Sequence, residues 1–301
     1  MTTVTTLRRP TAATPPPARR RHRPSATAAL RRLPLRLLVG LLIVVEAGPM
    51  VWMLLSSFKS QNAIVSGGVF SLPSSLEWSN YSEAWLTGDF AHNVWISVLV
   101  TFPALLLLLL FGAAAGFALE IMVWKRRNST LLYFVAGIMV PAQMLLVPLF
   151  LAYFRLGLTQ TVWPFILTYS AMGLPLTVFM MAAYFRALPR EVFESATLDG
   201  ASMLRCFFSI ALPMSSNALI TLGLVEFFSI WNDLLIALTF VTNPKLATVQ
   251  VGLLNFSGEF GQTAYGPLFA AICMNVLGTL VIFLVLNQRI MKGMVSGAVK
   301  G

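Results

Sequence analysis

Residues 194–213 read ESATLDGASMLRCFFSIALP and form a polar island between two long apolar segments of the chain. Gly200 can adopt the left-handed backbone conformation that ends a helix. Pro189, shortly before, suits the first turn of a helix because its missing N–H costs little there. Apolar residues recur at helical spacing after the glycine, namely Met203, Leu204, Phe207, Phe208 and Ala211. The loop 186–213 is therefore expected to hold two short helices that meet at a glycine bend.

The segments around this island are apolar enough for a membrane. The chain of 301 residues is 57% hydrophobic and 11% charged, and its mean hydropathy of +0.78 excludes an ordinary soluble globular protein. A helix needs roughly 20 apolar residues to cross about 30 Å of hydrocarbon, and it satisfies its own backbone hydrogen bonds in lipid. We expect an all-α multi-pass membrane protein with six transmembrane helices, near 37–57, 94–119, 131–154, 162–185, 218–241 and 267–286.

Basic residues indicate how these spans are oriented. Lys and Arg are retained on the cytoplasmic side of a membrane, and six spans place both termini on one side. Of the 21 Lys and Arg residues, all but Lys59, Arg155 and Lys245 fall on the side of the termini. The prediction is a cell (plasma or inner) membrane protein whose N- and C-termini and 186–213 loop are cytoplasmic.

The same patterns predict four parts of the chain. Residues 1–36 are rich in Arg, Thr, Ala and Pro and contain no acidic residue, which indicates a disordered basic tail. Such a tail suits contact with the anionic lipid bilayer better than with nucleic acid. Residues 37–92 then hold the first transmembrane helix and an outer loop, 93–290 the transmembrane core with the loop 186–213, and 291–301 a cytoplasmic C-terminal tail.

Motifs for catalysis are absent from the sequence. It contains neither a G-x-x-x-x-G-K-[ST] phosphate loop nor a G-x-S-x-G nucleophile elbow. Cys206 and Cys273 fall in different compartments of this topology, and no His or Cys cluster suggests a metal. We expect a transport subunit rather than an enzyme, without metal or cofactor, whose energy comes from a partner or an ion gradient.

The spacing E-x-A-x-x-x-G-x9-I-x-L-P in residues 194–213 resembles the EAA loop of ABC importer permeases. The run from Asp199 to Ser202 is similar to the carbohydrate-uptake branch of that family. Ser195 departs from the usual alanine but is also small. The resemblance implies that this loop couples the chain to a dimer of ABC ATPase subunits, with Glu194 and Gly200 in a cleft of the ATPase. The residues implied are Glu194, Ser195, Ala196, Asp199, Gly200, Ala201, Ile210, Leu212 and Pro213. An amphipathic connector lying on lipid headgroups is the alternative for this loop.

Further stretches carry the same resemblance over roughly residues 40–301. They are VPAQ at 140–143 with VPL at 147–149, WND at 231–233, NFSGE at 255–259 and SGAVKG at 296–301. They are similar to maltose-type, binding-protein-dependent permeases of the six-span second kind. The resemblance implies a type I ABC importer permease that translocates a sugar or oligosaccharide by alternating access. It also implies a second permease subunit, usually in a heterodimer, and an extracellular sugar-binding protein.

Ionisable groups inside a membrane are costly and suggest a wet or protein-buried interior. On one helix, four polar residues of the fifth span fall within an arc of about 120°. These residues are Glu226, Ser229, Asn232 and Asp233, and Gln143 of the third span could join them in a substrate pathway. Trp231 turns away from this arc and is expected to pack. Association between helices is the alternative role for the polar stripe.

A second class of function stays open at this point. An ion-coupled secondary transporter or channel would also be apolar and would lack catalytic motifs. Such proteins usually show paired intramembrane charges and a repeated half, and neither pattern is convincing in this sequence. The ATP-driven importer is therefore the leading hypothesis.

Overall fold

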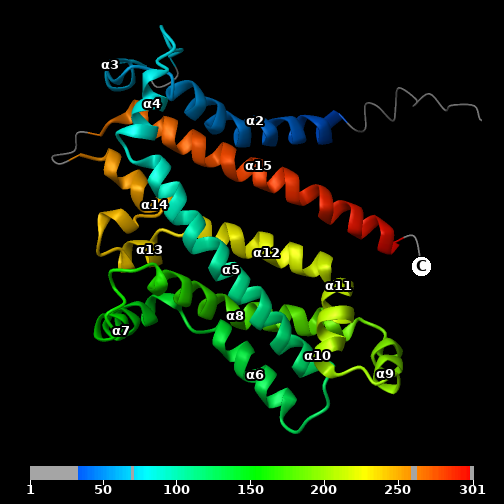
Figure 1. Ribbon diagram of the computed structural model, residues 1–301. Coiled ribbons are helices and arrows are strands. Elements are labelled where there is room, and N and C mark those ends of the chain that lie inside the picture. Colours follow the sequence, from blue (N-terminus) through cyan, green and yellow to red (C-terminus); the bar gives the residue numbers. More distant parts are fainter. Residues whose placement is uncertain (1–32, 69–70, 259–262, 299–301) are drawn as a thin grey trace, which may run out of the picture. The chain divides into compact units, whose positions relative to one another are not determined.

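The computed structural model describes residues 33–68, 71–258 and 263–298 (Figure 1). Within these residues every regular element is a helix, apart from one isolated bridge between Ser257 and Thr263. The chain divides into two compact units, Met1–Val51 and Trp52–Gly301. The boundary falls inside α2 (Leu33–Ser56). All the other described helices belong to the second unit.

Four long helices correspond to four of the six predicted spans. They are α2, α5 (Phe90–Glu120), α8 (Trp163–Arg186) and α15 (Tyr265–Ala298). Each contains a stretch that is long and apolar enough to cross a membrane. The structure adds detail at both ends of the chain. The helix α2 begins at Leu33, inside the tail predicted to be disordered, and α15 continues beyond residue 286 to Ala298. The remainder of the two predicted tails, 1–32 and 299–301, lies outside the described residues.

The third predicted span, 131–154, is wrong as a single helix. The chain forms α6 (Arg127–Ile138) and α7 (Ala142–Arg155), which meet at an angle of 95°. Pro141 precedes α7 with φ −63° and ψ 124°. A proline has no N–H to donate, and it disfavours helical geometry in the residue before it. The helix therefore breaks before Pro141, although the apolar sequence pattern continues through this point.

The fifth predicted span, 218–241, is also broken. The helix α12 (Ser216–Trp231) ends one residue before Asn232, and α13 (Leu235–Phe240) begins after a short break. At its other end, α12 makes an angle of 75° with the helical segment Met203–Met214. The two bent pairs are α6 with α7 and Met203–Met214 with α12. If each of these pairs is taken as one span, the described residues contain up to six candidate spans.

Shorter helices collect at the two ends of α5 and α8 (Figure 1). One end carries the 186–213 loop, with α9 (Arg190–Leu198), α10 (Met203–Cys206), the π-helix Phe207–Ala211 and α11 (Leu212–Met214). The other end carries the connections between spans. These contain α3 (Gln61–Val65), α4 (Ser79–Leu86), Pro244–Leu246, α14 (Val249–Gly252) and Leu253–Phe256.

Two hydrophobic cores lie along the packed pair α5 and α8. The larger core includes Phe165 and Phe240 and joins the first halves of these helices to α7, α12, α13 and α14. The smaller core includes Phe117 and Phe185 near the ends of the two helices, together with residues of the 186–213 loop. Small residues let the two helices approach closely, since a Cβ at Gly116 would lie 2.9 Å from the Ala182 backbone nitrogen. The loop thus packs directly against α5 and α8 through the smaller core.

Candidate functional site

The first of the two candidate regions is the 186–213 loop, which bends at Gly200. Gly200 has φ +83°, and its N–H donates to the Thr197 carbonyl at 3.1 Å. The next N–H, from Ala201, reaches back to the Ala196 carbonyl at 2.9 Å. This pair of bonds is the Schellman pattern, in which a glycine in the left-handed region ends a helix. The predicted glycine bend between two short helices is therefore present.

The inner face of α9 is fixed by one aromatic side chain. Phe193 is buried, and its ring lies 6.0 Å from the ring of Phe117 on α5, measured between centroids. Phe185 and Phe207 contact the same Phe117 ring at 5.8 and 5.4 Å. Four aromatic rings from α5, α8, α9 and the π-helix therefore form one cluster. A movement of α9 has to move or break this cluster.

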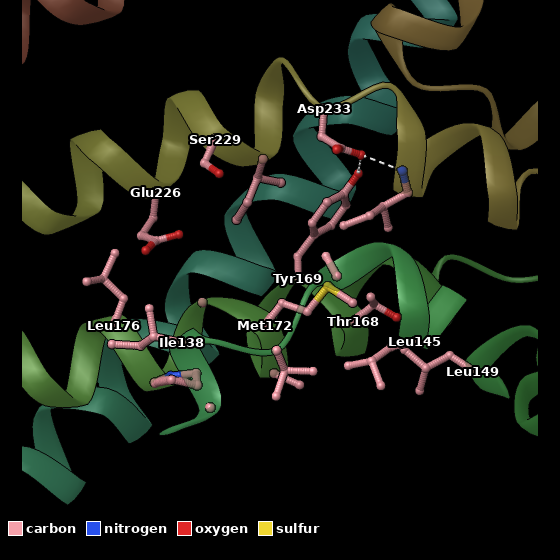
Figure 2. A pocket seen from close by; sticks show the side chains of 18 of the residues that line it. Ile138, Leu145, Leu149, Thr168, Tyr169, Met172, Leu176, Glu226, Ser229 and Asp233 are labelled. Carbon is pink, nitrogen blue, oxygen red and sulfur yellow. Dashed lines mark hydrogen bonds between the residues drawn. The ribbon is translucent and has the colours of Figure 1, made fainter. Parts of the chain in front are cut away.

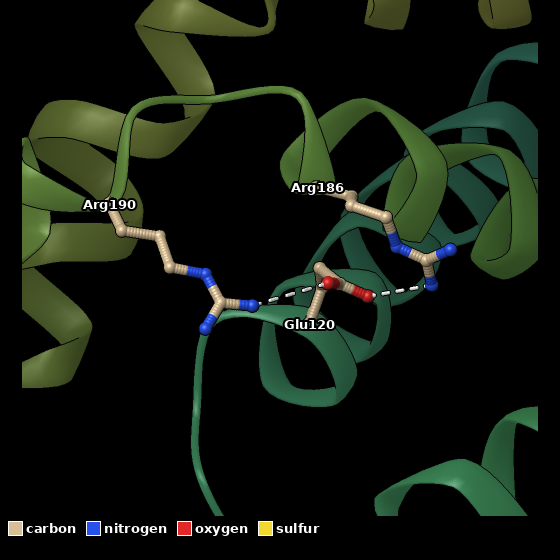
Figure 3. Close-up of polar contacts among 3 residues, drawn as sticks. All are labelled: Glu120, Arg186 and Arg190. Carbon is tan, nitrogen blue, oxygen red and sulfur yellow. Dashed lines mark hydrogen bonds and ion pairs between the residues drawn. The ribbon is translucent and has the colours of Figure 1, made fainter.

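An ion-pair group ties the same elements together on their polar side (Figure 3). Glu120, the last residue of α5, accepts a hydrogen bond from Arg186 at 2.9 Å and pairs with Arg190 at 3.7 Å. The Glu120 side chain is only 11% exposed, whereas both arginines are more than half exposed. Because Arg186 ends α8 and Arg190 begins α9, one carboxylate joins three helices. Sequence reasoning missed Glu120, which lies 66 residues before Arg186.

The outer face of the loop is exposed and partly apolar. Leu198 is 88% exposed, Leu204 is 71% exposed and Phe208 is 55% exposed. The predicted single stripe on the second helix is wrong, because Phe207 and Ala211 turn inward while Leu204 and Phe208 turn outward. The two rows, each with a spacing of four residues, lie on different faces of the segment formed by α10 and the π-helix Phe207–Ala211.

The residues implied by the EAA-like spacing do not share one face. Four of them are half-buried, namely Ala196, Ala201, Ile210 and Leu212, and they pack against the loop's own core. Five are exposed, namely Glu194, Ser195, Asp199, Gly200 and Pro213. Of the three small residues here, Ser195 is exposed, whereas Ala196 and Ala201 pack against the loop's own core.

The second candidate region is a pocket of about 750 Å³ (Figure 2). Its walls come from the end of α6, from α7, from the middle of α8, and from α12 with the start of α13. Most of the lining is apolar, including Ile138, Leu145, Leu149, Met172, Leu176 and Ile236. The polar lining residues are Tyr153, Thr168, Tyr169, Glu226, Ser229 and Asp233. The α6–α7 break and the α12–α13 break both lie at this pocket, through Val140 on one side and Asp233 on the other.

Asp233 fixes the geometry at the α12–α13 break. Its Oδ2 accepts hydrogen bonds from the Tyr169 hydroxyl at 2.9 Å and from the backbone N–H groups of Ile236 at 2.8 Å and Ala237 at 3.2 Å. An aspartate at this place satisfies backbone donors at the start of α13 that have no partner within the helix. Tyr169, which sequence reasoning missed, thus connects α8 to the start of α13.

Glu226 and Ser229 lie one turn apart on α12 and line the pocket with Asp233 (Figure 2). The Glu226 side chain is buried, and Gly173 on α8 leaves space for its carboxyl group. A Cβ at Gly173 would lie 3.0 Å from Glu226 Oε2. Three of the five predicted pathway residues are therefore brought to one pocket.

Asn232 and Gln143 do not line this pocket. Asn232 is exposed, its amide donates to the Phe228 carbonyl at 3.0 Å, and its carbonyl accepts from Gln250 at 3.3 Å. The helical arc that grouped Asn232 with Glu226 fails because α12 ends at Trp231. Gln143 is exposed on the first turn of α7.

Trp231 packs, as expected from its position on the helix. Its ring nitrogen donates to Asn275 on α15 at 2.8 Å, and its ring stacks on Phe227 at 5.4 Å. In the described part of the chain, no group of three or more His, Cys, Asp or Glu side chains converges as a metal site would require. Cys206 and Cys273 are both buried free thiols.

Known proteins are similar to this chain in sequence and in fold. The family model described as the binding-protein-dependent transport system inner membrane component matches residues 87–290. The probable ABC transporter permease protein YurM of Bacillus subtilis is 33% identical over 261 residues, which cover 87% of this chain and 86% of that protein. The diacetylchitobiose uptake system permease protein NgcG of Streptomyces coelicolor is 34% identical over 255 residues, covering 84% of each.

A solved structure has the same fold at lower identity. It is a chain of a bacterial ABC transporter involved in the import of the acidic polysaccharide alginate, with a TM-score of 0.77 and 19% identity over 88% of this chain and 98% of that chain. The family match contains both the 186–213 loop and the pocket. The predicted type I ABC importer permease architecture is confirmed. The chain belongs to the family of binding-protein-dependent transport system inner membrane components, which are membrane-spanning transport subunits of ABC importers.

Proposed function

We propose that this chain is the permease subunit of an ATP-driven importer that moves a sugar or oligosaccharide across the cell membrane by alternating access. The uptake of diacetylchitobiose by the system of a relative 34% identical supports a saccharide as the substrate class. The family description supports a separate binding protein that delivers it. A second permease, in a heterodimer, and two ABC ATPase subunits complete the assembly. Hydrolysis of ATP takes place in those partners, because this sequence contains no phosphate-binding loop.

The orientation proposed for the chain places both termini and the 186–213 loop in the cytoplasm. The distribution of Lys and Arg supports this orientation, since all but three of the 21 lie on that side. It also places the loop on the side where ATP is hydrolysed. Within the chain, residues 1–36, 37–92, 93–290 and 291–301 then serve as basic tail, first span with outer loop, transport core and C-terminal tail.

The 186–213 loop is proposed to be the surface that docks on the ATPase. Exposed apolar side chains at Leu198, Leu204 and Phe208 are costly to leave in water and favour a protein partner. The inner side of the loop is held to α5 and α8 by the Phe193 cluster and by Glu120. A push on the outer side is therefore transmitted to two membrane helices, which is what switching between inward and outward access requires.

The pocket is proposed to be part of the substrate pathway, and one observation carries this proposal. The break between α6 and α7 and the break between α12 and α13 both lie at the pocket, through Val140 and Asp233. Irregular backbone at membrane depth is tolerated only where it is buried in protein or lines a water-filled cavity. Transporters place discontinuous helices at their substrate sites for the same reason. Glu226, Ser229 and Asp233 are the pathway residues supported by this geometry, while Gln143 and Asn232 remain proposals without support from the pocket.

Co-purification tests the importer proposal directly. The chain is expressed with the ABC ATPase and the second permease of the same cell and isolated through an affinity tag on the ATPase. We expect a stable assembly, and we expect Leu198→Glu to release the ATPase because a carboxylate then faces an apolar cleft. Leu86→Glu serves as the matched control, since Leu86 is also exposed but lies on α4, outside the predicted spans and away from the loop.

Transport assays decide between energy sources. In proteoliposomes that hold the assembly and the binding protein, uptake of a saccharide is expected to require ATP. Uptake that persists without ATP and follows an ion gradient would reject the importer and support the secondary transporter. Failure of any ABC ATPase to co-purify would count equally against the proposal.

A further inference from the structure

The polar groups that line the pocket differ in whether they already have partners. Thr168 and Tyr153 share a hydrogen bond of 3.0 Å between their hydroxyl oxygens, and Tyr169 donates to Asp233. Glu226 and Ser229, in contrast, make no hydrogen bond or ion pair with the residues that the structure describes. Figure 2 shows the Glu226 carboxyl directed into the pocket toward Leu176 and Ile138. A buried carboxyl group without a partner is costly, so it is available to a solute that enters.

The charge of the lining is one-sided. Its two ionisable acids are Glu226 and Asp233, and no Lys, Arg or His is among the residues that line the pocket. Three neutral donors already bind and stabilise the Asp233 carboxylate. Glu226 has no such compensation. With a proton it can donate to a sugar hydroxyl, and without one it can accept from a hydroxyl or an amine. As a carboxylate it repels an anion, and the lining offers no positive side chain that would attract one.

We propose that Glu226 makes this pocket selective by charge, so that it accepts uncharged or amine-bearing saccharides and rejects those that carry carboxylate, sulfate or phosphate groups. The inference rests on the proposed function, because it takes the pocket to belong to the saccharide route. The Coulomb interaction between a carboxylate and a second charge about 7 Å away, in a medium of effective dielectric constant about 20, changes an affinity by on the order of tenfold or more. Gly173 supports the arrangement, since any larger residue would crowd the Glu226 carboxyl.

Charged thiol reagents measure this preference without knowledge of the natural substrate. Cys206 and Cys273 are replaced by alanine, and Ser229→Cys places a single thiol one turn from Glu226. The assembled transporter is reconstituted in proteoliposomes and treated with methanethiosulfonates that carry either a trimethylammonium or a sulfonate group. Each rate is divided by the rate of the same reagent with free cysteine in solution. We expect the normalised rate of the cationic reagent to exceed that of the anionic reagent by about tenfold.

Two variants assign the preference to Glu226. Glu226→Gln is expected to lower the ratio of cationic to anionic rates several-fold, whereas Glu83→Gln, which removes an exposed carboxylate on α4, leaves the ratio unchanged. A ratio that is the same with and without Glu226 overturns the inference. A normalised ratio of cationic to anionic rates at or below one in the Ser229→Cys protein that keeps Glu226 also overturns it. This measurement holds even if Glu226→Gln fails to assemble. Absence of any labelling at position 229 overturns it as well, because the pocket would then be closed to solutes.

The outcomes separate this inference from the function on which it rests. Uptake that does not depend on ATP would reject the importer while the charge ratio at position 229 remained valid. ATP-driven uptake with an unchanged ratio in Glu226→Gln would reject the charge selection alone.

Discussion

The 186–213 loop and the pocket beside α12 use polar and apolar side chains in opposite ways. In the loop, an aromatic cluster lies on the inner side and Glu120 is paired with two arginines. The apolar side chains on the outer side of the loop are exposed. In the pocket, the walls are apolar and the uncommitted groups, Glu226 and Ser229, point inward. The difference fits the two proposed roles, in which the loop docks on the ATPase and the pocket forms part of the substrate pathway.

The largest expected effect separates the two faces of α9. Phe193→Ala removes a buried ring from the four-ring cluster and leaves a cavity, which is expected to lower stability by about 3–5 kcal/mol. Leu198→Ala is the matched change on the outer face and should leave stability within about 0.5 kcal/mol. Thermal unfolding of the purified chain measures both, and co-purification measures ATPase binding, which both variants should weaken. Equal losses of stability would show that α9 has no distinct inner face.

The next effect concerns the α12–α13 break. Asp233→Ala leaves the backbone N–H groups of Ile236 and Ala237 without their acceptor, at a cost of about 1–3 kcal/mol for each buried group left unpaired. Tyr169→Phe removes one of the three donors but leaves these two satisfied, so it should cost about 1 kcal/mol. Thermal unfolding of the two variants in detergent gives the comparison. If Tyr169→Phe destabilises the protein as much as Asp233→Ala, the aspartate does not serve mainly to start α13.

Two glycines test whether the loop bend has a role beyond backbone geometry. Gly157 ends α7 with φ +69°, and its N–H and that of Leu158 make the same pair of bonds as those after α9. A Cβ meets no neighbour within 4 Å at either glycine. Alanine at either position should therefore cost about 1 kcal/mol through strain alone. We expect Gly200→Ala, but not Gly157→Ala, to lower the amount of substrate transported per ATP hydrolysed. Equal coupling in both variants would reduce Gly200 to a structural role.

The smallest effect lies in the ion-pair group at Glu120. Arg186→Ala should cost up to about 1 kcal/mol and Arg190→Ala less, because the arginines are largely exposed and the second pair is longer, at 3.7 Å against 2.9 Å. Both losses should shrink at high ionic strength, where exposed charges are screened. Thermal unfolding at low and high salt measures them. A larger loss of stability for Arg190→Ala than for Arg186→Ala would contradict this prediction. The longer ion pair, at the first turn of α9, would then be the stronger one.

Much of the loop and of the membrane architecture could be predicted from the sequence. Gly200 ends α9 as predicted, because the sign of φ at a helix end depends on the residue itself and a glycine accepts a positive value. The positions of α5, α8 and α15 follow from the length of apolar sequence that crosses hydrocarbon. The pathway residues were predicted less well. A helical wheel grouped Asn232 with Glu226 in one polar arc, but it cannot show that α12 ends at Trp231.

By itself, the sequence determined the class of protein, the apolar segments, the polar loop and the glycine at its bend. These features rest on local chemistry, namely transfer into hydrocarbon, the sign of φ and the missing N–H of proline. The tertiary structure alone decided that two spans break at one pocket and that Glu120 joins Arg186 and Arg190. It also decided that Tyr169 reaches Asp233, 64 residues further along the chain. Contacts between residues so far apart in the sequence depend on how the helices pack. The sequence pattern within one helix does not show which other helix packs against it.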